Sequence, residues 1–256
     1  MTNVLVCIKR VPDAAGEVLL TADEQAVDAR FVGFTISAHE SCAVELAVRI
    51  AAANGGTATV LTLGPSEAVE QLRAALGVGC SSALLIEADP VGFGPADVAR
   101  EIAALVAAHA AEGRRYDVVL LGNDAADTGD FQVGIRLAYE LGRPVVNGVR
   151  TVEVDAGVAT ARGDGLQGVE TFTVPLPAVV AVLEGGVEPR YPTITGRMKA
   201  KKAKIEIVTP RLEQRGPGRV GLTLPPAQPS TVEVLGAGPD AAPAVVHLLQ
   251  RMGVMG

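Results

Sequence analysis

The stretch YDVVLLGNDAADTGDFQVGIRLAYELG, residues 116–142, decides the fold because it combines a strand, a polar loop and a helix in succession. The run VVLL is typical of a strand that is covered on both faces, as in a parallel sheet. Short acidic, amide and glycine residues at 123–130 favour a loop. From Val133, apolar residues recur about every 3.6 positions, which indicates a helix. A helix N-terminus is therefore expected at the carboxyl edge of a sheet, where phosphates are commonly bound.

The same stretch allows a second interpretation, a surface turn between strand and helix that binds no ligand. Most such loops bind nothing, and neither the Walker spacing nor GxGxxG is present here. The residues of this stretch alone leave both interpretations open.

The chain before this stretch repeats the same pattern of strand and helix. Apolar runs predict strands at 3–8, 57–63 and 82–86, and helical periodicity follows each of them, within 43–51, 69–76 and 95–106. Residues 1–145 thus alternate strand and helix four times, which predicts an α/β fold with a mostly parallel sheet wrapped by helices. A small hairpin or ribbon is expected outside the sheet, around 18–20 and 31–34.

From Pro144 onward, strand patterns separated by glycine and aspartate replace the helical period. They cover residues 145–154, 158–161, 168–174 and 178–183. No linker composition intervenes, so we expect an antiparallel extension of the same sheet. A loop is expected over 184–192, followed by a cluster of basic residues within 197–204 and a last strand at 205–208.

The C-terminal segment differs in composition from the rest of the chain. Residues 209–230 contain five prolines, and a helical pattern returns at 239–252. We therefore divide the chain into an α/β domain, 1–208, which is the candidate for nucleotide binding, and a C-terminal arm with a helix, 209–256. Such an arm is expected to dock onto another subunit, and a tail that folds back on its own domain is the alternative.

Composition excludes several classes of function. The chain has 256 residues, 48% of them hydrophobic, so it can bury a core without disulfides, and its three cysteines form no CxxC pair. A net charge of -7 and the absence of tryptophan disfavour nucleic acid as a partner. The N-terminal apolar run is too short for a signal peptide or a membrane span. A cytoplasmic protein without membrane insertion is expected.

The segment VEPRYPTITGRMKAKKAKIEIV, residues 187–208, resembles the signature of the electron transfer flavoprotein β subunit. Further stretches that resemble this family are VLVCIKRVPD at 4–13, AVELAVRIAA at 43–52, TVLTLGPSEAVEQLRAAL at 59–76, DVVLLGNDAADTGDFQVG at 117–134 and LPAVVAV at 176–182. The resemblance runs in order from about residue 3 to 210, and only the C-terminal arm matches loosely.

This resemblance implies an adenine-nucleotide α-hydrolase-like fold and an electron carrier subunit, not an enzyme. The family's β subunit usually holds AMP and pairs with an α subunit that carries the redox-active FAD. The heterodimer takes electrons from acyl-CoA or related dehydrogenases, as in fatty acid oxidation, and passes them to a membrane quinone oxidoreductase. In electron-bifurcating members a second FAD replaces AMP. The sequence DTGDFQVG at 127–134 is similar to the bifurcating pattern DGDTAQVG with threonine and glycine exchanged, so AMP is expected and a second FAD is the alternative.

The resemblance also implies a nucleotide site, which agrees with the expected carboxyl ends of adjacent strands. Backbone N–H groups of Gln132 and Val133 are expected to bind phosphate, and Asp127 a sugar hydroxyl or a loop amide. Departures from the family are Asp124, where an amide is frequent, Ala14, where many members have an aromatic residue, and the run 37–40, where an aromatic near the flavin is usual. The cofactor-binding residues are Cys7, Ser37, Leu63, Gly122, Asn123, Asp124, Ala125, Asp127, Thr128, Gly129, Phe131, Gln132 and Val133.

A partner-recognition loop is implied at 188–198, with Ile194 as its apolar anchor. An exposed apolar side chain beside lysines, on an acidic protein, is typical of a hot spot within an electrostatic rim. The expected partner-binding residues are Pro189, Arg190, Tyr191, Ile194, Met198, Lys199 and Lys202.

Two other functions share the expected fold. A universal-stress-type adenine nucleotide-binding module would self-dimerise and lack the 187–208 signature. An ATP pyrophosphatase needs an SGGxDS-like loop after the first strand, where this chain has KRVP at 9–12. No Ser–His–Asp set and no metal-ligand cluster is visible in the sequence.

Overall fold

The computed structural model describes residues 1–13, 18–215, 220–226 and 232–255. Within them the chain forms two compact units, Met1–Leu222 and Thr223–Gly256, which are described separately. Ala14 and parts of the C-terminal arm lie outside the described residues. Among the residues described, no helix is both long and apolar enough to cross a bilayer.

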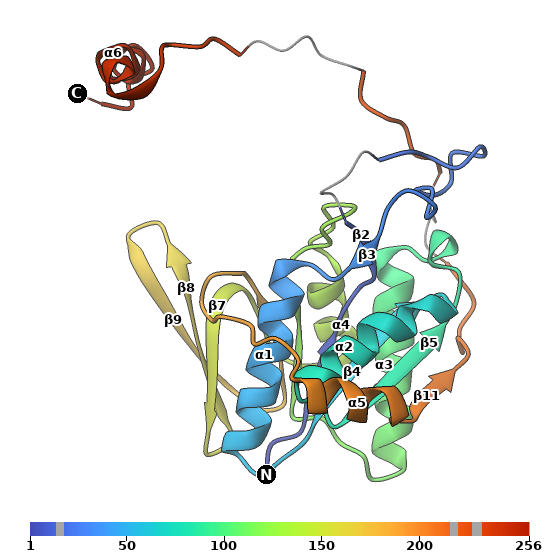
Figure 1. The fold of residues 1–256 in the computed structure, drawn as a ribbon. Coiled ribbons are helices and arrows are strands. Elements are labelled where there is room, and N and C mark those ends of the chain that lie inside the picture. Colours follow the sequence, from blue (N-terminus) through green and yellow to red (C-terminus); the bar gives the residue numbers. More distant parts are fainter. Residues whose placement is uncertain (14–17, 216–219, 227–231, 256) are drawn as a thin grey trace. The chain divides into compact units, whose positions relative to one another are not determined.

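The strands of the first unit form a nine-stranded sheet in the order β11-β5-β4-β1-β6-β10-β7-β8-β9 (Figure 1). All neighbours from β11 to β7 are parallel, whereas β8 is antiparallel to β7 and β9 to β8. The predicted α/β fold with a mostly parallel sheet and an antiparallel part is confirmed. The strands are β1 (Val4–Cys7), β4 (Ala58–Gly64), β5 (Ser82–Glu87), β6 (Val118–Gly122), β7 (Val145–Asp155), β8 (Val158–Gly165), β9 (Gly168–Pro175), β10 (Ala178–Val182) and β11 (Ile205–Val208).

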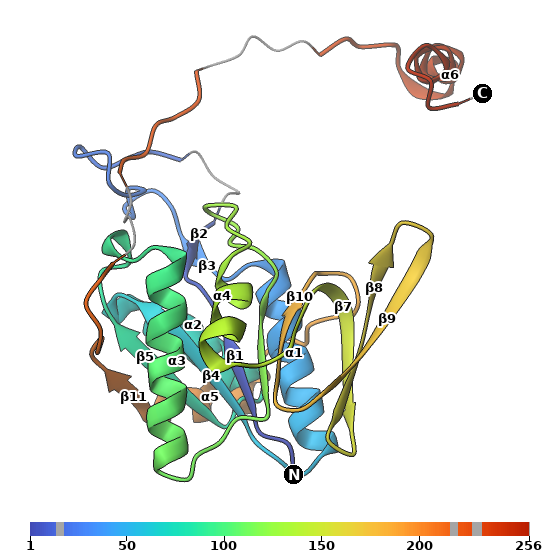
Figure 2. The same cartoon turned by 180° about the vertical axis from the view of Figure 1, so that it is seen from behind.

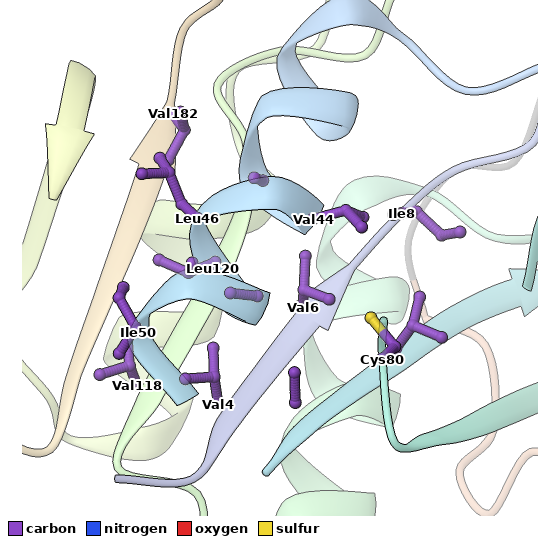
Figure 3. Packing of buried hydrophobic residues seen from close by; sticks show 14 of the residues in the cluster. Val4, Val6, Ile8, Val44, Leu46, Ile50, Cys80, Val118, Leu120 and Val182 are labelled. Atoms are coloured by element: carbon purple, nitrogen blue, oxygen red, sulfur yellow. The ribbon is translucent and has the colours of Figure 1, made fainter. Parts of the chain in front are cut away.

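Helices cover both faces of this sheet, because successive residues of each buried strand point to opposite sides. Val4 and Val6 pack with α1 and α2, as Figure 3 shows for α1. Leu5 and Cys7 pack with α3 and α4. Figure 2 shows these two helices on the face of the sheet opposite α1. The helical elements are α1 (Ala38–Ala53), η1 (Ser66–Ala68), α2 (Val69–Val78), η2 (Pro90–Gly92), α3 (Pro95–Ala111), α4 (Val133–Leu141), α5 (Ile194–Lys202), η3 (Gly238–Ala241) and α6 (Ala242–Arg251).

The position of β10 corrects the expectation for the second half of the chain. Only β8 and β9 are antiparallel additions, since β10 inserts between β6 and β7 and runs parallel to both. All residues of β10 are buried, because Val180 packs on one face of the sheet and Val179 on the other. Strands that follow one another in sequence are most often neighbours in space, and β10 departs from that rule.

The expected hairpin outside the main sheet is present as small antiparallel pieces. β2 (Val11–Pro12) pairs with β3 (Phe34–Thr35), and Leu20 bridges Val27. The guanidinium of Arg10 stacks over the Phe34 ring at 3.4 Å from its centroid, which joins this ribbon to the end of β1.

The loop expected over 184–192 contains no helix or strand, but the second half of the partner-recognition loop implied at 188–198 is helical, because α5 begins at Ile194. The Thr193 hydroxyl caps this helix by accepting a hydrogen bond from the Gly196 N–H at 3.0 Å. Lysines occupy its last turn, where the helix dipole favours cations. Arg73 of α2 donates to the carbonyls of Ala200 and Lys201 at this end, the latter at 2.9 Å.

The first part of the expected arm is fastened to α3 of its own unit. The buried Glu101 carboxylate accepts hydrogen bonds from the backbone N–H groups of Arg211 and Leu212, at 2.9 and 2.7 Å. Buried Asp97 accepts one from the Arg215 N–H at 2.9 Å. The second unit contains the helix expected at 239–252, which the structure places in η3 and α6.

Candidate functional site

Predicted site residues lie at or near the carboxyl ends of three strands, β1, β4 and β6, at the same edge of the sheet. Cys7, the last residue of β1, is in register with Leu61 of β4 and Leu121 of β6. Leu63 lies near the end of β4, and Gly122 ends β6 in register with Val182 of β10. The carboxyl ends of these parallel strands thus meet where the 122–132 loop begins.

The 122–132 loop is ordered by hydrogen bonds within its own backbone. Ala125 N–H donates to the Asp130 carbonyl at 3.1 Å, and Gly129 N–H donates to the Ala125 carbonyl at 2.7 Å. Gly129 has φ +66°, a conformation that glycine adopts without strain. Asn123 ties the loop to the sheet, because its N–H donates to the Val182 carbonyl at 3.0 Å and its side chain accepts from Gly148 N–H at 2.8 Å.

The acidic side chains of the loop are engaged within the protein. Lys9, just after β1, binds the Asp127 carboxylate with its Nζ at 2.6 Å from Oδ1. The Thr128 hydroxyl donates to Asp130 at 2.9 Å. Asp124 pairs with His39 Nδ1 at 2.5 Å. These contacts hold the loop carboxylates to partners, so they reduce the repulsion that an incoming anion would meet.

Helix α4 presents an uncapped N-terminus at this edge. Its N-cap residue Gln132 makes no side-chain capping hydrogen bond, and the Gln132 amide oxygen accepts from Arg136 instead. The first N–H groups of a helix have no partner within the helix. A Cβ added at Gly134 would lie 3.0 Å from Leu121 Cδ1, so the helix start packs tightly on β6. Backbone donors at Gln132 and Val133 are therefore available to an anion at the sheet edge.

The start of α1 borders the same edge, where Ser37 and Glu40 form a capping box. Glu40 is buried and accepts hydrogen bonds from the N–H groups of Ser37 and Lys9, at 2.9 and 2.6 Å. Burial raises the pKa of Glu40 to about 7 despite these donors. Burial, with a smaller contribution from Glu40, also raises the pKa of the Cys7 thiol to about 12. Cys7 therefore lines this edge as a neutral thiol and not as a reactive thiolate.

The sequence-based site omitted Lys9, His39, Glu40 and Glu184. His39 lies between Asp124 and Glu184, at 2.5 and 3.9 Å from their carboxylate oxygens. A Cβ added at Gly122 would lie 2.9 Å from Glu40 Cγ, so α1 and the end of β6 are in close contact. The sequence SAHE at 37–40 has the pattern of a capping box, which could have indicated the role of Glu40. Nothing comparable in the sequence joins Glu184 to this edge.

The predicted partner-binding residues lie on a different surface, along α5 and the segment before it. Tyr191, Ile194 and Met198 are 90%, 80% and 60% exposed. Ile194 and Met198 are four positions apart on α5 and share one face of the helix. Lys199 and Lys202 are exposed on the same helix. Arg190 instead binds Glu45 of α1, at 2.7 Å from each carboxylate oxygen.

No group of histidine, cysteine, aspartate and glutamate side chains suited to a metal ion occurs in the described part of the chain. The uncapped start of α4 at the sheet edge is suited to an anion, and a separate apolar and basic surface lies on α5.

Comparison with known proteins identifies the family. Residues 26–212 match the family model of the electron transfer flavoprotein domain. The chain is 36% identical over 215 residues to the electron transfer flavoprotein subunit beta of Mycobacterium leprae, covering 82% of this chain and 79% of the relative. It is 32% identical over 236 residues to that of Syntrophomonas wolfei, covering 91% and 89%. It is 32% identical over 204 residues to that of Bacillus subtilis, covering 80% and 77%.

The region matched by the family model includes the 122–132 loop, the start of α4 and the α5 surface, and these relatives are named as electron transfer flavoprotein subunits and not as enzymes. The chain belongs to the electron transfer flavoprotein family, among its β subunits.

Proposed function

We propose that this chain is the β subunit of a heterodimeric electron transfer flavoprotein and that it holds AMP at the carboxyl edge of its sheet. The observation that carries this proposal is the uncapped N-terminus of α4, which the 122–132 loop borders. A phosphate fits there because backbone N–H groups of Gln132 and Val133 are free to donate to it.

The loop residues fit a nucleotide in a further respect. Lys9 pairs with Asp127 and offsets its charge, and the Thr128 hydroxyl donates to Asp130 and fixes the orientation of that carboxylate. We propose that Ser37, Leu63, Asn123, Ala125 and Phe131 complete the walls of the site, with the side chains of Cys7 and Glu40 closing it from the sheet and from α1.

The redox chemistry belongs to FAD, which we place mainly on the α subunit. The heterodimer would accept electrons from an acyl-CoA or related dehydrogenase and pass them towards a quinone oxidoreductase. We assign dehydrogenase docking to the α5 surface, where the exposed Ile194 and Met198 lie beside Lys199 and Lys202 on a protein of net charge -7.

The second unit is assigned to contact with the α subunit. Val232 and Val234 are both 82% exposed, and α6 carries Val245 and Val246 partly exposed. Apolar side chains of this kind are stabilised when a partner covers them.

The test is to co-express the chain with its α subunit, denature the purified complex and identify the released nucleotides. One AMP and one FAD per heterodimer would support the proposal. Two FAD without AMP would favour the electron-bifurcating type, to which the sequence at 127–134 has some similarity. A complex that releases one FAD and no other nucleotide would overturn the nucleotide site. A stable self-dimer that does not bind the α subunit would favour a universal-stress-type module.

A further inference from the structure

The segment at residues 184–193, here called the strap, connects β10 to α5 and is fixed at both ends. At its start, a Cβ added at Gly186 would lie 2.1 Å from the Arg150 carbonyl oxygen, so the strap lies directly against β7. The Cys42 thiol donates to the Val187 carbonyl at 3.4 Å. At its end, Thr193 caps α5, and Pro192 packs against Gly77 of α2, where an added Cβ would be 3.1 Å away.

Between these ends, the strap covers a cavity of about 750 Å³ that α1 and α2 line from below. The middle of the strap therefore borders open space on the side of this cavity. Tyr191, in this span, is 90% exposed. The hydrogen bonds that hold the middle of the strap come from Arg190, whose Nε, Nη2 and backbone N–H all donate to Glu45, at 2.7, 2.7 and 3.3 Å.

Glu45 is a buried carboxylate in the middle of α1, with a side chain only 1% exposed. Pairing a buried carboxylate with arginine contributes little net stability compared with a well-packed apolar residue, because the carboxylate loses its hydration. Its two-pronged geometry with arginine, in contrast, defines position and angle closely. The arrangement is therefore better suited to fixing the strap in one place than to stabilising the fold.

We propose that Glu45 and Arg190 are positioning residues that hold the strap rigid, so that Tyr191 and Ile194 are presented in one fixed geometry to the partner dehydrogenase. Arg190 then acts within this subunit, through Glu45, and makes no essential contact with the partner. This inference rests on the proposed docking function of α5. A fixed surface binds more tightly than a mobile one, because less conformational freedom is lost on association.

The chain contains a matched control for Arg190. Arg49 also donates to Glu45, with Nε at 2.5 Å from Oε1, but it lies on α1 itself. The two arginine side chains are similarly exposed, at 53% for Arg49 and 49% for Arg190. Arg49→Lys and Arg190→Lys thus make the same chemical change at the same carboxylate, and only Arg190→Lys loosens the strap.

The experiment uses the complete heterodimer and compares Arg190→Lys, Arg49→Lys and Ile194→Ala in steady-state reduction by the dehydrogenase. We expect Arg190→Lys to raise the KM for the flavoprotein roughly fivefold with kcat nearly unchanged, because lysine cannot reproduce the bidentate contact. Arg49→Lys should leave both constants at wild-type values. Hydrogen exchange of the amide at position 190 should become roughly tenfold faster in Arg190→Lys alone. Flavin and nucleotide content should be unchanged in all three variants.

The outcomes separate two kinds of failure. If Ile194→Ala raises KM while Arg190→Lys matches Arg49→Lys in KM and in amide exchange, the positioning role is wrong and docking by α5 stands. If Ile194→Ala leaves KM at the wild-type value, docking by α5 is wrong, and the proposed role of the strap is wrong with it.

Discussion

Two buried glutamates on α1 illustrate how differently the two proposed functional surfaces, the nucleotide edge and the α5 surface with its strap, are built. Glu40, at the nucleotide edge, receives backbone N–H donors at 2.6 and 2.9 Å, yet burial raises its pKa to about 7. For Glu45, beneath the strap, burial also acts to raise the pKa, but hydrogen bonds from Arg190 and Arg49 outweigh it and lower the pKa to about 2. Five positions apart on the same helix, one carboxyl group is readily protonated and the other stays anionic.

The difference reflects the range of the contacts that order each surface. The nucleotide edge is arranged by backbone hydrogen bonds within the 122–132 loop and at the adjoining strand ends, so its partners are mostly polar groups of the main chain. The strap depends on a side-chain charge pair that joins residues 145 positions apart. Local main-chain order suits a site that must present N–H donors, and a long-range charge pair suits a segment that must be held over a cavity.

The largest loss of stability is expected from Gly186→Val, which changes the start of the strap where it contacts β7. Because an added Cβ would lie 2.1 Å from the Arg150 carbonyl oxygen, the strap cannot reach its position without moving β7. We expect a loss of roughly 4 kcal/mol in the free energy of unfolding, near the upper end for one substitution. Thermal unfolding of the heterodimer measures it. Gly33→Val, where nothing lies within 4 Å of the added Cβ, is the control and should have little effect.

A smaller effect is expected from Glu40→Gln, and it depends on pH. The folded-state pKa of about 7 lies above the ordinary glutamate value of 4.5, so the folded protein holds this proton more tightly than the unfolded chain. This tighter proton binding stabilises the folded state fully below about pH 4.5, and the stabilisation is lost as the pH rises to about 7. Wild type should lose up to about 3 kcal/mol relative to Glu40→Gln across this window. All other titratable groups are shared by the two proteins, so the difference between the two unfolding midpoints isolates Glu40; parallel curves would contradict the raised pKa.

Gly129→Val tests the nucleotide edge with a modest cost in stability. Valine at φ +66° is strained by about 1–2 kcal/mol, although nothing lies within 4 Å of the added Cβ. We expect more than half of the bound nucleotide to be lost, because the loop must change its backbone to relieve the strain. Gly157→Val makes the same kind of change, at φ +80° in open space between β7 and β8, and should keep its nucleotide. Equal nucleotide content in the two variants would remove Gly129 from the site.

The smallest effect is expected at Cys7, whose thiol should not react in the folded complex. Burial raises its pKa to about 12, and the side chain is nearly inaccessible. Iodoacetamide at neutral pH should leave Cys7 unmodified over a time in which denatured protein reacts fully. Peptide mass spectrometry reports the labelling. Rapid alkylation of native protein at Cys7 would show that the nucleotide edge opens to solvent.

Sequence patterns were sufficient where contacts are local or where strands are buried on both faces. The periodicity after Val133 and the aliphatic runs of β1, β4 and β6 predict the parallel sheet and the N-terminus of α4. The loop residues at 123–130 were predicted from turn chemistry alone, and Gly129 has the positive φ that this chemistry allows. Such features depend on neighbours within a few residues.

Features set by distant contacts could not be predicted in the same way. The start of α5 at Ile194 was missed, since glycine and a run of lysines weaken the helical pattern, while Arg73 and the close approach of Gly77 to Gly196 support the helix from α2. The pairing of Arg190 with Glu45 joins segments that share no pattern. The insertion of β10 between β6 and β7 was also missed, because an apolar run does not specify which strands lie beside it.

That insertion has a consequence for synthesis on the ribosome. β6 is made early, but its edge toward β7 can be covered only when β10, ending at Val182, has emerged. Translation proceeds at about 5–20 residues per second, so this strand edge is open for several seconds in every nascent chain. During that interval, chaperones and neighbouring nascent chains have access to an aliphatic strand that the finished protein never exposes, and translation speed between residues 122 and 182 is expected to influence the yield of folded subunit.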